Sequence, residues 1–199
     1  KTGTNTLNLY GANTYSGTTT ISGGTLQLSN NGSAMASLNT SSAIVVSSGT
    51  TFYYNDWRGT TNNDVLANTI SGSGTLIQYS YGTDTLVITG NNTSFSGAVS
   101  INNGTLQVGN GGSSGSLGTA TITGGALVYD LVGGSAITTP IISGTAVTVL
   151  AGTTLKIGNA TVLPNGTTGT GSITVNGTLD LNGYSPTLGD LEGAATGTI

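Results

Sequence analysis

Ile21-Ser-Gly-Gly-Thr-Leu-Gln-Leu28 is the stretch that decides the fold, because its Gly-Thr-Leu triplet returns along the chain at a nearly constant interval. Intact triplets begin at Gly24, Gly74, Gly104 and Gly177, and near copies begin at Gly49, Gly125 and Gly152. In chain order, most of these glycines are separated by about the same number of residues as Gly24 and Gly49. The step before Gly104 is longer, and the step after it is shorter. Repetition at this interval is typical of a solenoid, in which each unit buries its apolar face only by stacking on its neighbours.

Each unit has the pattern of two short strands joined at a glycine corner. Residues 19–22 and 25–28 alternate apolar and polar side chains, and glycines that tolerate positive φ separate them. Ile21 lies in a short strand-like run just before its glycine corner. Equivalent runs precede later glycines, at residues 43–47, 120–123, 146–150 and 172–176. Parallel crossover connections are overwhelmingly right-handed. The sequence therefore predicts an all-β fold, a right-handed parallel β-helix with about 25 residues per coil.

The apolar residue at a fixed place in each unit is expected to point into the solenoid. We expect two inward columns, one formed by Leu26, Leu76, Leu106, Leu155 and Leu179, and the other by Ile21, Ile70, Ile101, Ile122 and Ile173. Stacked coils are about 4.8 Å apart, so side chains of one column are in contact. These ten residues are the predicted structural ladder.

Charged residues are unusually rare. The chain has 3 Lys+Arg and 7 Asp+Glu, so 5% of its residues are charged, against about 25% in ordinary soluble domains. Its basic residues, Lys1, Arg58 and Lys156, are far apart, which argues against nucleic acid as a partner. No apolar run approaches the length that a membrane-spanning helix needs, so we expect no direct membrane insertion.

Histidine and cysteine are absent from the sequence. This removes disulfides, thiolate chemistry, a Ser-His nucleophile pair, and metal sites built on His or Cys. We therefore expect no catalytic residues, no metal site and no cofactor, and predict that the protein is not an enzyme.

One irregular stretch, residues 52–64, holds the only Trp, the only Arg and two of the seven acids. An aromatic platform beside a carboxylate can bind a sugar, and a carboxylate pair can hydrolyse one. Candidate ligand-binding residues are therefore Tyr53, Tyr54, Asp56, Trp57 and Arg58, with Asp64 the nearest second acid. The simpler interpretation is that the aromatic residues cover the end of a coil while Asn55 and Asp56 form a turn.

A second, longer repeat lies beneath the short one. Residues 7–28 recur as residues 86–108, and the offset between the copies grows by one at an inserted serine, Ser94. The offset matches Leu7 with Leu86, Gly11 with Gly90, Tyr15 with Phe95, Gly17 with Gly97, Ile21 with Ile101 and Leu26 with Leu106. This longer period would also suit tandem immunoglobulin-like sandwiches, but the shorter period and the very short strands count against them. Apolar residues at fixed places count against a disordered stalk.

The run Leu7-Asn-Leu-Tyr-Gly-Ala-Asn-Thr-Tyr-Ser-Gly-Thr-Thr-Thr-Ile-Ser-Gly-Gly-Thr-Leu26 resembles the passenger-associated transport repeat of bacterial autotransporters. The second copy departs from it where Asn91 replaces Ala and Ser94 is inserted. The resemblance implies a passenger that is carried through the outer membrane by a C-terminal translocator β-barrel of the same polypeptide. It also implies display at the bacterial cell surface or secretion.

From the resemblance we expect residues 1–199 to be a single β-helix segment, a fragment of a longer passenger. It would act as a structural stalk that assists secretion and displays adhesive regions, with host surface glycans or proteins as candidate partners. The alternative is a carbohydrate-binding or carbohydrate-cleaving β-helix protein.

Overall fold

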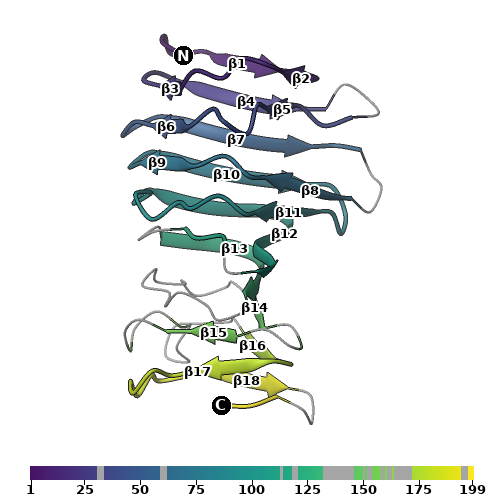
Figure 1. The fold of residues 1–199 in the computed structure, drawn as a ribbon, viewed down its shortest axis with the longest axis vertical. Coiled ribbons are helices and arrows are strands. Elements are labelled where there is room, and N and C mark those ends of the chain that lie inside the picture. Colours follow the sequence, from purple (N-terminus) through teal and green to yellow (C-terminus); the bar gives the residue numbers. More distant parts are fainter. Residues whose placement is uncertain are drawn as a thin grey trace.

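In the computed structural model the chain winds as a β-solenoid whose strands stack along one axis (Figure 1). The structure describes residues 1–30, 34–58, 62–112, 114–117, 121–131, 146–149, 151, 154–157, 160, 163, 172–193 and 197–199. Every strand pairing within these ranges is parallel, and none of these residues is in a helix. The same residues accordingly include no helix that could cross a membrane. The predicted solenoid is confirmed.

Three kinds of strand follow one another in each coil, and we refer to their stacks as faces. The first face contains β1 (Thr6–Leu9), β4 (Thr25–Ser29), β7 (Thr51–Asp56), β10 (Thr75–Ser80) and the first parts of β12 (Ala98–Gly112) and β13 (Thr121–Leu131). The second contains β2 (Ala12–Asn13), β5 (Ser37–Leu38), β8 (Asn63–Leu66), β11 (Thr85–Ile88), the later parts of β12 and β13, β14 (Ala146–Val149), β16 (Ser172–Val175) and β18 (Asp190–Gly193). The third contains β3 (Thr19–Ile21), β6 (Ile44–Val46) and β9 (Ile70–Gly72). A separate pair, β15 (Thr154–Lys156) and β17 (Thr178–Asp180), lies near the C-terminus.

Paired residues on neighbouring rungs are about 23 residues apart in sequence. The separation is smaller than this between Ser172 and Asp190 and larger between Thr25 and Thr51. The strands keep their register while the loops between them vary in length. This is why the glycine spacing in the sequence is close to the coil length without being constant.

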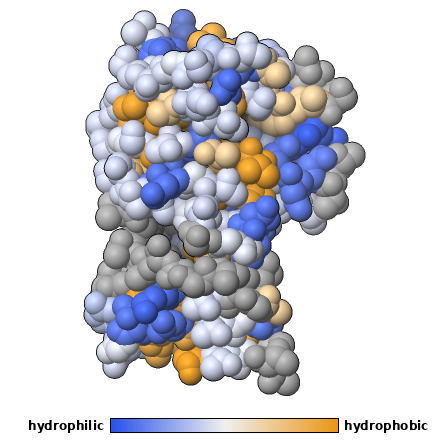
Figure 2. All heavy atoms as spheres, in the orientation of Figure 1, coloured by the Kyte–Doolittle hydropathy of each residue, from blue (hydrophilic) through white to orange (hydrophobic). Residues whose placement is uncertain are grey.

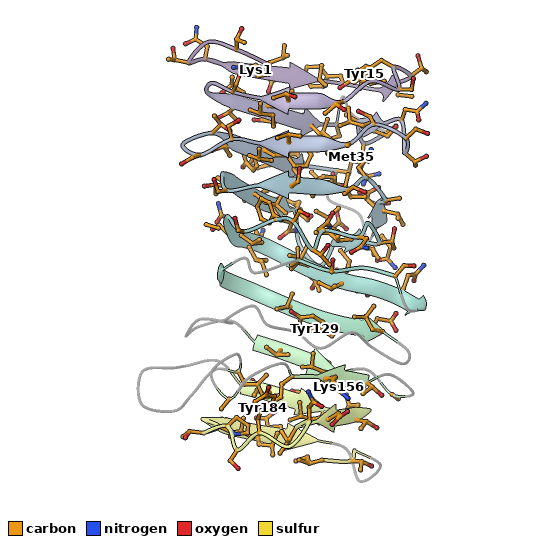
Figure 3. The ribbon with its side chains drawn as sticks, turned by 60° about the vertical axis from the view of Figure 1, so that its left-hand side comes forward. Lys1, Tyr15, Met35, Tyr129, Lys156 and Tyr184 are labelled. Carbon is orange, nitrogen blue, oxygen red and sulfur yellow. The ribbon has the colours of Figure 1, made fainter. Side chains whose placement is uncertain are left out.

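The core is a set of inward columns produced by strand alternation. On the first face Leu26, Phe52, Leu76 and Val99 are in register, and none is more than 1% exposed. The threonines that precede the first three of them in sequence are on the outer side and are half-buried. Farther along the solenoid Tyr129 occupies the interior (Figure 3) and is 2% exposed. Each rung therefore buries its apolar side chains against the rungs on both sides.

The composition of the two predicted columns is wrong, although every member whose side chain is described is buried. Leu106 is in register with Leu86 and Leu127 on the second face, in the column that also contains Ile173. The remaining predicted members lie as follows: Ile101 opposite Gln78, Ile122 opposite Val99, Ile70 opposite Ile44, Ile21 opposite Val46, and Leu155 opposite Leu179.

The prediction placed Leu106 in the wrong column because the offset between the two long repeats is not a whole number of rungs. Val99 is three rungs from Leu26, and Leu106 lies farther along β12 than Val99, on the next face.

The two long repeats nevertheless share one internal register. In the first copy Leu7 pairs with Leu26, and in the second copy Leu86 pairs with Leu106. Each copy therefore winds far enough for its last strand to pair with its own first strand. The long repeat is a self-contained unit of one closed rung.

Candidate functional site

The candidate residues of the 52–64 stretch lie on β7 and just beyond it. Alternation along β7 points Tyr54 and Asp56 into the solenoid, whereas Tyr53 is on its outer side. Trp57 follows on the outer side and is 54% exposed. The structure thus divides the predicted ligand-binding set between the interior and the surface.

Asp56 is bound by Arg58 in a two-pronged ion pair. Nε of Arg58 donates to Oδ1 of Asp56 at 2.9 Å, and Nη2 donates to Oδ2 at 2.7 Å. The backbone N–H of Arg58 also donates to Oδ1, at 3.0 Å. Side-chain exposure is 1% for Asp56 and 11% for Arg58. A carboxylate held in this way is fully engaged, because bidentate pairing is the strongest geometry that Arg offers.

Asp64 of β8 completes the cluster. Nη2 of Arg58 donates to its Oδ2, and the Tyr54 hydroxyl donates to the same oxygen at 2.7 Å. One guanidinium therefore joins two carboxylates from consecutive strands and ties the end of β7 to β8. Asp64, the second acid near the predicted ligand-binding residues, is part of this cluster. Its proximity to Asp56 in the sequence already indicated such a contact.

The environment moves the pKa values of the two carboxyl groups in opposite directions. Burial opposes ionisation of Asp56, but the hydrogen bonds and charge of Arg58 outweigh it and lower the Asp56 pKa. Burial dominates at Asp64 and raises its pKa, against the opposing effects of Tyr54 and Arg58. Burial and the hydrogen bond to Asp64 also raise the pKa of Tyr54. The cluster thus sets two carboxyl groups against a single guanidinium.

This geometry does not suit hydrolysis of a sugar. A glycosidase needs two carboxyl groups that flank the scissile bond with room for the substrate between them. Here Arg58 fills the space between Asp56 and Asp64, and Asp56 is buried. The arrangement holds a corner of the solenoid in place.

An aromatic pair lies outside the cluster. The ring of Trp57 stacks on Tyr79 of β10, with ring centroids 4.7 Å apart and planes at 30°. Burial raises the pKa of Tyr53, and the nearby Tyr79 raises it further. Tyr53 and Tyr79 therefore lie close together on the outer face. Sequence reasoning missed Tyr79, although its outward position two residues after Ile77 in β10 is the signal that could have found it.

A pocket of about 230 Å³ opens beside the cluster, with Tyr54 and Asp64 in its lining. It is lined by residues of β5 and β8 and of the segments next to them: Leu28, Met35, Ala36, Ser37, Leu38, Thr40, Tyr54, Asp64, Val65, Leu66 and Asn68. Figure 2 shows one face of the molecule, on which hydrophobic residues adjoin strongly hydrophilic ones in the N-terminal half. Met35, one of the lining residues, is labelled in that half of the solenoid in Figure 3. Sequence reasoning did not predict this pocket.

The remaining acids of the described ranges form no comparable site. Asp190 and Glu192 are exposed on β18. Asp180 pairs with Lys156 at 3.2 Å on the surface, where an ion pair contributes little. No group of three or more acids within those ranges could hold a metal ion.

Residues 1–28 and 81–108 match the family model described as passenger-associated-transport-repeat. The two matched segments end at the strands that contain Leu26 and Leu106, and so include the closed rung of each copy. No curated protein and no solved structure matches the chain.

Proposed function

Because the chain carries two passenger-associated transport repeats on a β-solenoid, we propose that it is a stalk segment of an autotransporter passenger. The observation that carries the proposal is the shared register of the repeats, Leu7 with Leu26 and Leu86 with Leu106. A segment that closes its own rung can fold as soon as it is free, and it offers an edge on which the next rung forms.

The proposed role in secretion follows from this order of folding. In a solenoid each rung contacts only its neighbours, so folding propagates along the axis. A chain without cysteine can pass through a narrow pore with no disulfide to block it. Rungs that fold outside the cell would then prevent backsliding, while the C-terminal translocator barrel of the same polypeptide provides the pore. We place the segment at the bacterial cell surface or in the secreted passenger, where it would display adhesive regions.

The proposal gives the segment no enzymatic activity and no cofactor. The interior carboxylates are held by Arg58 and Tyr54, and both carboxylates serve the connection between β7 and β8. Incubating the protein with polysaccharides tests this part. Cleavage that is lost in both Asp56→Asn and Asp64→Asn would show that the cluster is catalytic.

The secretion role is tested by surface display. Residues 1–199 are joined to an autotransporter translocator barrel, and the amount of protease-accessible chain on intact cells is measured. Leu106→Asp, which places a charge in an inward column, should reduce display several-fold, whereas the outward substitution Thr105→Asp should leave it unchanged. Equal display of all three proteins would contradict a role for rung folding in secretion.

A second candidate function is carbohydrate binding, favoured by the exposed Trp57 stacked on Tyr79. Aromatic faces on an uncharged surface suit neutral sugars, and Tyr53 would extend the platform. A glycan array probed with the wild type and with Trp57→Ala tests it. Tyr10→Ala serves as the control, because Tyr10 is similarly exposed but follows β1, which β4 separates from β7. Binding that Trp57→Ala leaves intact would remove this candidate.

A further inference from the structure

The backbone ladder of the second face is interrupted once in the N-terminal half of the solenoid. Among the described residues β5 pairs only with β2, and β8 pairs only with β11, although β5 and β8 belong to consecutive coils. The Asn68 side chain crosses the interruption at one end, donating to the carbonyls of Asn39 and Ser42 at 2.8 Å each. The 230 Å³ pocket occupies the space that the missing pairing leaves.

The pocket combines an apolar body with one acidic group. Leu28, Leu38 and Leu66 supply buried aliphatic surface, and Met35 and Val65 extend it toward the opening. The acidic group is Asp64, whose side chain is 23% exposed. A pocket of this kind is complementary to a short carbon chain that carries one charge.

The sign of that charge follows from the cluster behind the pocket. Asp56 and Asp64 share a single guanidinium, so a second cation beside Asp64 would give each carboxyl group a positive partner. Both hydrogen bonds to Asp64 use Oδ2, and within the described ranges Oδ1 makes none. Among the described residues Oδ1 therefore has no donor, and Asp64 lines the pocket.

We propose that this pocket binds a small organic monocation, a primary ammonium group on a short aliphatic chain, with the ammonium donating to Oδ1 of Asp64. The aliphatic chain lies against Leu28, Leu38 and Leu66. The pocket is smaller than the roughly 300–1,000 Å³ of sites for drug-sized ligands, which limits the chain to about five carbons. A primary ammonium group on a short aliphatic chain can come from a free alkylamine or from the lysine side chain of another protein. This inference does not depend on the proposed function.

Binding is measured by isothermal titration and by ¹H–¹⁵N NMR with n-pentylammonium as the probe. Pentan-1-ol has the same carbon chain without the charge, and pentanoate has the opposite charge. The expected order is pentylammonium first, pentan-1-ol at least about tenfold weaker, and pentanoate undetectable, because a hydrogen bond to a charged group is worth roughly a factor of ten or more. Amide shifts should centre on residues 35–40 and 64–68. Equal binding of pentylammonium and pentan-1-ol, or shifts elsewhere, would overturn the proposal.

Two variants separate the charge from the cavity. Asp64→Asn should abolish the preference for the cation, and Asp190→Asn, the same change on exposed β18, should preserve it. If Asp64→Asn fails to fold, Ser37→Phe replaces it, since Ser37 is an exposed residue at the pocket opening and a phenyl ring there should block all binding. Unchanged cation binding in a folded Asp64→Asn or Ser37→Phe protein would contradict the site.

The two sources are distinguished by a second probe. A Gly-Lys-Gly peptide with blocked ends presents the same kind of alkylammonium group on a backbone. Binding by both probes identifies the pocket as a lysine receptor for a protein partner, and binding by pentylammonium alone identifies a site for free amines. Binding by neither overturns the proposal.

Discussion

Asp64 is in register with Leu86 on the next rung, so a carboxylate occupies the column position that leucine holds at residues 86, 106 and 127. An ionised group in an apolar column is tolerated only when it is paired and hydrogen-bonded. Arg58 and Tyr54 supply those partners. The cluster follows from this exchange of a leucine position for an acid.

The two aspartates should give stability opposite dependence on pH. The folded-state pKa of Asp56 is lowered below its usual value of 3.8, so its stabilising contribution is present above pH 3.8 and is lost as pH falls through the folded pKa. The folded-state pKa of Asp64 is raised, so its contribution is present below pH 3.8 and is lost as pH rises through the folded pKa. Urea unfolding across the acidic range up to neutral pH measures both effects.

The matched variants are Asp56→Asn and Asp64→Asn. The free energy of unfolding of the wild type minus that of Asp56→Asn should increase with pH, and the corresponding difference for Asp64→Asn should decrease. Asp190→Asn, which changes an acid on exposed β18 outside the cluster, is the control. Slopes of the same sign for the two cluster variants would show that Arg58 does not separate their pKa values.

Gly97→Ala should destabilise the protein by more than about 2 kcal/mol, because an added Cβ would overlap the Gly74 carbonyl of the preceding rung. Gly17 is the equivalent residue of the first repeat, and a Cβ there meets nothing within 4 Å. Gly17→Ala should therefore be neutral or stabilise by up to about 1 kcal/mol. Thermal unfolding of both variants provides the comparison. Equal melting temperatures would mean that Gly74 and Gly97 are not on touching rungs.

Leu106→Ala should lower the free energy of unfolding by about 2–5 kcal/mol, since Leu106 is fully buried between Leu86 and Leu127. Thr105→Ala, one position earlier and pointing outward, should change it by less than about 0.5 kcal/mol. Denaturant titration followed by circular dichroism measures the difference. Similar losses in the two variants would contradict the inward and outward alternation of β12.

Much of the fold could be predicted because strand alternation and glycine corners are local properties of the sequence. The Gly-Thr-Leu interval indicated the solenoid, and each predicted inward residue with a described side chain is buried. The column that each one joins depends on the loops, which add residues without changing the register of the strands. Leu106 therefore belongs with Leu86, and a fixed period could not place it there.

The site was less predictable than the fold. The sequence brought Tyr54, Asp56 and Arg58 together, but it could not show that one guanidinium joins Asp56 to Asp64. The pocket depends on a pairing that does not form between β5 and β8, and sequence patterns indicate pairings that do form. Trp57 and Tyr79 meet across consecutive rungs, so their contact depends on the rung length.

The register of neighbouring rungs tests the whole account most directly. The chain has no cysteine, so a double variant with cysteine at Thr85 and Thr105 contains one possible disulfide. These residues pair in the structure, and neighbouring strands about 4.8 Å apart are within the range of Cα separations that disulfides allow. The account predicts rapid and nearly complete oxidation of this pair, detected by mass spectrometry, and slow oxidation of the pair at Thr85 and Gln107, which is out of register. Equal oxidation of the two pairs, or faster oxidation of the second, would contradict the parallel solenoid.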